Sequence, residues 1–336
     1  MSQPTAQVLP DGDALAPERH RRRWMRLAIG LPILTLVWCF VLHSLIVSFR
    51  KIDFHQLHLD LWPIAAAVVA LLAARLMNGM NCSMLLTALG QPAPMRHVVA
   101  AIWVASLGRY VPGKMAVVAG LAFLLVRLGV RLSAALAALS LSGILMILIG
   151  LITCTPLLFT PLMRQRVPFG WLISLLILLA GLVGLHPRVF SAICNTMLRR
   201  MKRQPLPHQL QRASLLRAVG FTVLRNLFLG LGLWLAMRSL SHVRLSDYAL
   251  ALGSAGLASV AGFLAVFAPA GLGVHEGVYI LTLTPLLGPQ AALLAVLFRC
   301  LHLLADAIAG AAGILMMKRP PAPDILPTST NASEQP

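Results

Sequence analysis

Seven acidic or strongly basic side chains lie inside the long apolar runs of this chain. The cations are Arg75, Arg109, Lys114, Arg225 and Arg299, and the acids are Glu276 and Asp306. A cation in hydrocarbon costs roughly 3 kcal/mol on insertion scales, and five cations against two acids leave three positive charges without compensation. This surplus predicts a cationic cavity that binds anions, and the abundant anion of a membrane is lipid phosphate.

Arg109 and Lys114 lie five positions apart in the segment SLGRYVPGKMAVVAG, residues 106–120. Between them, Pro112 removes a backbone donor and Gly113 releases helical geometry, so the helix is expected to break here. The free N–H groups that begin the second half-helix would then join the two cations in binding a phosphate group. In the alternative interpretation, both side chains extend to the headgroups and only anchor the tip of the turn.

A second break is expected in FAPAGLGVHEGVYILTL, residues 267–283. The residues that interrupt the helix there are Pro269, Gly271 and Gly273. Glu276, in the first turn of the following helix, either caps free N–H groups or pairs with a cation and is protonated or displaced when substrate arrives. His275 is a candidate proton relay, although a lone histidine more often serves as a structural hydrogen-bonding group.

Three further polar residues share one face of the last apolar run. Arg299, His302 and Asp306 follow the spacing i, i+3, i+7, which places them along one side of a helix. Arg299 and Asp306 are expected to pair with each other or with Glu276, or to line the same cavity.

The composition excludes a soluble globular protein. Of the 336 residues, 58% are hydrophobic and 11% are charged, and the mean hydropathy is +0.82, whereas soluble domains contain about 25% charged residues. The net charge of +18 therefore indicates contact with anionic headgroups and not with nucleic acid. The five cysteines have no paired spacing and no nucleotide-binding loop occurs, so neither a metal nor a cofactor is expected.

The hydropathy pattern predicts an all-α membrane protein with six full spans and two re-entrant hairpins. Runs long enough to cross about 30 Å of hydrocarbon occur at 27–48, 62–89, 133–158, 169–186, 217–237 and 290–317. The interrupted runs, interpreted as hairpins, are 98–126 and 248–287.

The distribution of basic residues favours hairpins over single crossings. With two hairpins, 17 of the 23 basic residues outside the apolar runs fall on one side and 6 on the other, whereas two single crossings give 12 and 11. Cytoplasmic loops carry an excess of lysine and arginine, so the hairpin topology is preferred. Two ordinary helices with kinks at their prolines and glycines are the alternative.

The same topology divides the membrane domain, 27–317, into inverted halves, 27–158 and 169–317, each with three spans and one hairpin. Many transporters are built in this way, with interrupted helices marking a binding site near the membrane midplane. The basic tail 1–26 and the tail 318–336, expected to be disordered, then both lie in the cytoplasm.

The motifs GRYVPGK and PAGLGVHEG, with LFRCLHLLAD on the run that follows, resemble the lysylphosphatidylglycerol synthase transmembrane region family, also described as flippase-like integral membrane proteins. The resemblance implies a role in moving or presenting lipids, including aminoacylated phospholipids. The residues that match the motifs are Arg109, Pro112, Gly113 and Lys114 in the first, and Gly271, Gly273 and Glu276 in the second.

Two departures from that family matter. The chain has no room for the soluble aminoacyl-transfer domain of the fusion members, so it is not expected to make lysyl lipid by itself. In addition, LSAALAALSLSGIL contains no acid, whereas many relatives carry one shortly after the first hairpin, and any ion coupling that relies on this acid is therefore not expected.

We therefore expect a lipid transporter or flippase of a bacterial inner membrane, without a catalytic residue, whose partners are membrane lipids. A lipid-modifying enzyme is a further candidate partner. The residues expected to bind lipid phosphate are Arg109, Lys114 and Arg299, and those expected to tune or gate the site are Glu276, Asp306 and His275. Two alternatives stay open. One is an integral-membrane glycosyl- or acyltransferase with Glu276 as general base, and the other is an accessory subunit of a lipid-modifying synthase.

Overall fold

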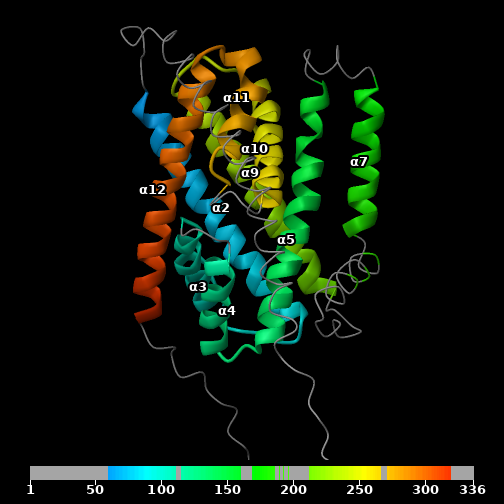
Figure 1. The fold of residues 1–336 in the computed structure, drawn as a ribbon, viewed down its shortest axis with the longest axis vertical. Helices are drawn as coiled ribbons and strands as arrows, with labels where there is room; N and C mark the ends of the chain where they lie inside the picture. Colours follow the sequence, from blue (N-terminus) through cyan, green and yellow to red (C-terminus); the bar gives the residue numbers. More distant parts are fainter. Residues whose placement is uncertain are drawn as a thin grey trace, which may run out of the picture.

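A computed structural model describes residues 60–110, 115–159, 169–185, 212–265 and 271–318, with a few single positions between 186 and 211. All regular structure in these ranges is helical (Figure 1), which confirms the all-α prediction. The helices are α2 (Leu61–Ala88), α3 (Met95–Leu107), α4 (Met115–Arg127), α5 (Leu132–Cys154), α7 (Gly170–Leu185), α9 (Arg212–Arg238), α10 (Tyr248–Leu264), α11 (Val274–Leu287) and α12 (Gln290–Lys318), with short 3-10 turns η3 (Gly108–Tyr110), η4 (Thr155–Phe159) and η5 (Leu245–Asp247).

Five helical segments of the described chain are long and apolar enough to cross a membrane. Four of them, α2, α5 with η4, α9 and α12, correspond to predicted spans. The fifth, Leu245–Leu264, combines η5 and α10 and was expected to be one arm of the hairpin 248–287. The predicted span 169–186 contains α7, whose 16 residues rise about 24 Å, and α7 is not among the five long segments. The predicted span 27–48 lies outside the described residues.

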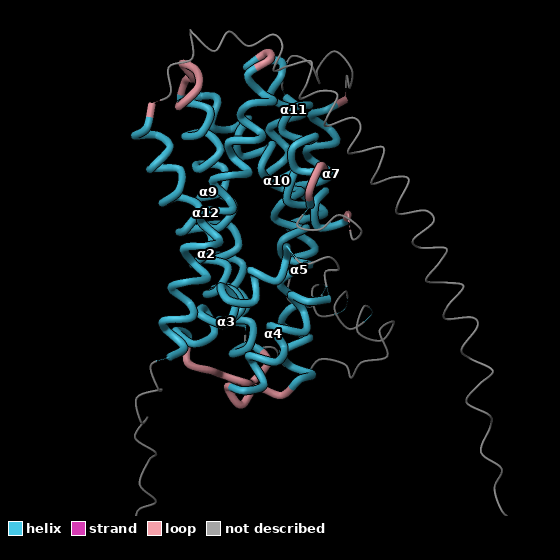
Figure 2. Tube along the Cα trace, turned by 60° about the vertical axis from the view of Figure 1, so that its left-hand side comes forward, coloured by secondary structure: helices cyan, strands magenta, loops and turns pink. Residues whose placement is uncertain are grey.

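Helices α3 and α4 are too short to span the membrane singly. Each has 13 residues and is about 20 Å long, against the roughly 30 Å of a hydrocarbon core. Both lie in the lower part of the molecule, where α3 leads into η3 (Figures 1 and 2). The predicted break residues Pro112 and Gly113, and Lys114 beside them, lie outside the described residues.

Two of the predicted break residues of the second run, Gly271 and Gly273, lie outside regular helix, between α10 and α11. Gly271 and Gly273 have φ of 66° and 80°, a left-handed conformation that glycine adopts without steric cost. Helix α11 begins immediately after them, at Val274, and contains 14 residues. Pro269, the third predicted break residue, lies outside the described residues.

Helices α2 and α9 lie side by side and connect two apolar cores. The N-terminal part of α2 and the C-terminal part of α9 pack with α10, α11 and α12 around Phe298. The C-terminal part of α2 and the N-terminal part of α9 pack with α3, α4 and α5 around Leu125 and Leu141. Arg75 on α2 and Arg225 on α9 therefore lie where the two cores meet, since each is flanked along its helix by residues of both cores.

Candidate functional site

A small polar cavity lies between helices of both cores. Its volume is about 60 Å³, several times the ~15 Å³ that one water molecule requires. Its walls come from α2, η3, α9, α10, α11 and α12. The lining residues are Arg75, Arg109, Arg225, Leu229, Ser259, His275, Tyr279, Arg299, His302 and Asp306. Five of the six described charged residues counted inside the apolar runs are thus gathered at one place.

Asp306 joins three elements through its two carboxylate oxygens. Its Oδ1 lies 2.6 Å from Nε of Arg75 on α2, and its Oδ2 lies 3.4 Å from Nη1 of Arg109 in η3. The Asp306 side chain is only 1% exposed, whereas that of Arg109 is 33% exposed. The contact with Arg75 is therefore the tight, buried one, and the contact with Arg109 is longer and more accessible.

Glu276 both caps helix α11 and pairs with a cation. Its Oε2 accepts a hydrogen bond from the backbone N–H of Gly273 at 2.8 Å, which caps the first turn of α11. Its Oε1 lies 3.7 Å from Nε of Arg299. The expectation that Arg299 pairs with Glu276 is thus met, while Asp306 pairs with Arg75, a partner that the sequence did not indicate.

Arg225 is the cation with the least compensation in this cavity. Its Nη1 donates to Oδ1 of the neighbouring Asn226 at 2.8 Å, but no carboxylate of the described chain lies within ion-pair distance of it. Four arginines line the cavity, and Asp306 and Glu276 are the acids that pair with three of them. Among the described residues the site therefore carries a net charge of +2.

His302 presents a buried donor. Nη2 of Arg75 lies 2.8 Å from Nδ1 of His302, and because a guanidinium only donates, Nδ1 must accept and the ring hydrogen must be on Nε2. That Nε2 is buried and has no hydrogen-bond partner among the described residues. Buried polar groups are nearly always satisfied, so an unsatisfied N–H on a ring that lines the cavity indicates a place for an acceptor.

His275 packs against two glycines. A Cβ at Gly262 would overlap Nε2 of His275, and a Cβ at Gly271 would lie 2.7 Å from the same atom. The ring faces Tyr279 edge-on, with 6.4 Å between centroids. Gly262 and Gly271 therefore make the space that allows His275 to reach the cavity wall.

Gly262→Ala is expected to displace His275 and to lower the free energy of unfolding by about 1–3 kcal/mol, the usual cost of overpacking. The matched control is Gly220→Ala on α9, where a Cβ has no neighbour within 4 Å and alanine favours the helix by about 0.5–1 kcal/mol. Thermal unfolding in detergent micelles should show a lower midpoint for the first variant and an unchanged or higher one for the second. Equal midpoints would contradict the close packing at His275.

The structure brings together most of the sequence-predicted site residues that it describes. Arg109, Arg299, His275 and Asp306 line the cavity, and Glu276 contacts it through Arg299. Lys114, predicted as a phosphate ligand, lies outside the described residues. No group of three or more His, Cys, Asp or Glu side chains suited to a metal ion occurs in the described part of the chain.

Arg75, Arg225 and His302 were not among the residues predicted to bind or tune. The sequence signal for the two arginines is that each is a cation inside an apolar run. No motif marks either of them as a ligand. The signal for His302 is its position between Arg299 and Asp306 on one helix face. What the sequence does not contain is which cation each acid neutralises.

The comparisons with known proteins give one family. The family described as "Lysylphosphatidylglycerol synthase TM region" matches residues 21–310. The search for similar curated proteins found no significant match. The matched range includes every residue that lines the polar cavity.

Proposed function

We propose, since the chain belongs to the lysylphosphatidylglycerol synthase transmembrane region family, that it carries an anionic lipid across the membrane and binds the lipid phosphate in the polar cavity. The family and the five long apolar helices make it an integral membrane protein. The observation that carries the proposal is the charge of the cavity: a net +2 within apolar helices, with Arg225 lacking a carboxylate partner among the described residues.

Arg225 and His302 would make the first contacts with the phosphate group. Arg225 can donate two parallel hydrogen bonds to phosphate oxygens, and the Nε2–H of His302 supplies a third donor. Both groups are already in the cavity wall, so binding satisfies them without breaking an ion pair.

Two longer ion pairs would then exchange partners with the phosphate. Arg109 is 3.4 Å from Asp306 and Arg299 is 3.7 Å from Glu276, whereas Arg75 holds Asp306 at 2.6 Å. A phosphate can therefore recruit Arg109 and Arg299 at modest cost, while the Arg75–Asp306 pair keeps α2 and α12 together. When the lipid leaves, the two carboxylates recover their partners, which is the tuning role expected for Glu276 and Asp306.

The arrangement of the short helices supports an inverted pair of re-entrant hairpins. On this proposal, α3 with α4 enters from one leaflet and α10 with α11 enters from the other, and their breaks face the same cavity through Arg109 and His275. Transporters use such opposed interrupted helices to form a site near the midplane. Lys114, next to the first break, would add a further cation to the phosphate site.

The charges at the two ends of the bundle support a cytoplasmic location for both termini. Helices α3 and α5 begin, and α4 ends, at one end of the bundle, where α9 also begins (Figure 1). Helix α12 also ends there, at Lys318. The described charged residues of these helix ends are Arg96, Arg127, Arg131, Arg212, Arg217 and Lys318, and those at the other end are Arg238, Arg244, Asp60 and Asp247. A net +6 against zero follows the positive-inside rule, as expected for a protein of the inner membrane of a bacterium.

Arg225→Met is expected to slow the transfer of fluorescent phosphatidylglycerol across liposomes that contain the purified protein. A charged hydrogen bond contributes about 1.5–3 kcal/mol, so the rate should fall roughly ten- to a hundredfold. The rate is measured from the fraction of labelled lipid that a membrane-impermeant reductant quenches over time.

The matched control is Arg217→Met, an exposed arginine two turns earlier on the same helix, which should leave the rate within about twofold of wild type. Phosphatidylcholine with the same label serves as the comparison without net charge. Equal transfer of phosphatidylglycerol in wild-type, Arg225→Met and protein-free liposomes would overturn the transport proposal for this lipid.

A further inference from the structure

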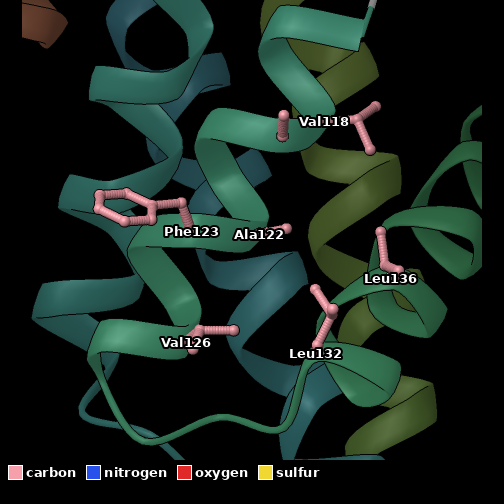
Figure 3. A pocket seen from close by; sticks show the side chains of 7 residues that line it. Val118, Ala122, Phe123, Val126, Leu132 and Leu136 are labelled. Atoms are coloured by element: carbon pink, nitrogen blue, oxygen red, sulfur yellow. The ribbon is translucent and has the colours of Figure 1, made fainter.

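A second pocket, apolar where the first cavity is polar, lies between α4 and α5 (Figure 3). It is an apolar groove of about 440 Å³. Its walls are Val118, Ala119, Ala122, Phe123, Val126, Leu132 and Leu136. Figure 3 shows the small side chain of Ala122 on α4, with Phe123 on one side of it and Leu132 and Leu136 of α5 on the other.

The groove is open to the surroundings of the protein. Phe123 is 56% exposed and Leu132 is 52% exposed. In a membrane protein such apolar side chains face hydrocarbon, so the space between them must be filled by an acyl chain or by an apolar segment of protein. A hollow that is apolar throughout does not hold ordered water.

Two arginines stand where the groove reaches the end of the bundle. Arg127 directly follows the lining residue Val126, and its guanidinium lies 4.5 Å from the centroid of the Phe123 ring. Arg131 directly precedes the lining residue Leu132 and is exposed. No acid of the described chain lies in α4, α5 or the turn between them. One end of the groove is therefore cationic and the remainder is apolar. The cationic end is complementary to the phosphate group of an anionic lipid, and the apolar part is complementary to its acyl chain.

We propose that this groove is a binding site for one anionic glycerophospholipid, with an acyl chain along α4 and α5 and the phosphate group on Arg127 and Arg131. The cation–π contact with Phe123 orients the Arg127 guanidinium at the mouth of the groove. On this proposal the groove holds a resident lipid. Lipid binding there is independent of transport through the polar cavity, because the two sites share no lining residue.

The test is native mass spectrometry of the full chain exchanged into detergent with equal amounts of phosphatidylglycerol and phosphatidylcholine. The wild type should retain one phosphatidylglycerol. Ala119→Trp fills the groove at an exposed position and should lower that occupancy at least about tenfold. Ala311→Trp is the control, because Ala311 is an exposed alanine on α12, away from the groove, and this variant should retain the lipid.

The arginines are tested by Arg127→Gln combined with Arg131→Gln. The preference for phosphatidylglycerol should fall roughly thirtyfold, since each basic side chain near anionic lipid contributes about a factor of five. Arg96→Gln with Arg212→Gln removes two exposed charges outside the groove and should alter the preference far less.

Three results would overturn the proposal. Equal lipid retention by both tryptophan variants would show that no acyl chain binds in the groove. An unchanged preference for phosphatidylglycerol after loss of the two arginines would show that they do not bind its headgroup. The third is a crosslink in native membranes between A119C and Cys39, which would place the apolar run 27–48 in the groove in place of a lipid. Because transport is not read in this experiment, its failure is independent of the Arg225→Met result.

Discussion

Asp306→Ala is expected to cause the largest loss of stability of any single substitution at the site. The change leaves Arg75 buried beside His302 without its carboxylate, which lies at 2.6 Å in the wild type. Removing one partner of a buried ion pair costs about 3–5 kcal/mol, because the remaining charge is uncompensated. The apparent midpoint of thermal unfolding in detergent micelles should fall steeply.

The control for Asp306→Ala is Asp60→Ala, which removes an exposed acid and should have an effect within about 0.5 kcal/mol. A second variant, Asp306→Leu combined with Arg75→Met, removes both charges of the pair. Replacing a buried pair by apolar groups is often neutral or stabilising, so this double variant should recover most of the lost stability. If Asp306→Ala unfolds at the wild-type midpoint, Asp306 does not hold α2 and α12 together.

Glu276→Gln is expected to strengthen anion binding and to slow lipid release. The substitution raises the net charge of the described cavity residues from +2 to +3, and Arg299 loses the carboxylate at 3.7 Å. Close charge pairs couple by about 1.5 kcal/mol or more, so affinity for phosphatidylglycerol should rise roughly tenfold or more while turnover falls. Both quantities can be measured with the same labelled lipid, by equilibrium binding in micelles and by transfer in liposomes.

A comparison with Glu276→Ala separates the charge of this residue from its capping role. Glutamine retains an oxygen that can accept from the Gly273 N–H, which donates at 2.8 Å in the wild type, whereas alanine loses it. Only the alanine variant should therefore lose the roughly 0.5–2 kcal/mol of a helix cap. Unaltered binding and turnover in Glu276→Gln would exclude the gating role.

The same pair of variants also bears on the transferase alternative. A general base cannot be replaced by glutamine without loss of the reaction. Loss of a glycosyl- or acyl-lipid product in Glu276→Gln, with lipid movement unchanged, would favour the enzyme over the transporter.

Most of the long helices could be predicted from the sequence, because an apolar run of more than twenty residues has few alternatives in a membrane. The shared face of Arg299, His302 and Asp306 could also be predicted, since helical periodicity alone places them together. The break at Gly271 and Gly273 is another local property, because positive φ strongly favours glycine.

The ion pairs could not be predicted in the same way. Arg75 and Asp306 are 231 positions apart, and their contact depends on how α2 packs against α12. The spacing in the first motif suggested Arg109 as a free phosphate ligand, whereas the structure pairs it with Asp306. Arg225 lies in no recognisable motif. Its uncompensated charge becomes evident only from the structure, in which Asp306 and Glu276 pair with the other three arginines.

The double membership of α2 and α9 in the two apolar cores has a consequence for how the protein can be divided. A fragment ending between α7 and α9 would expose the faces of α2 that α9 covers. The complementary fragment would lack α2, which packs with α9, α10, α11 and α12 in one apolar core. Co-expressed fragments cut at that point should therefore accumulate only as a pair, each protecting the other from proteolysis.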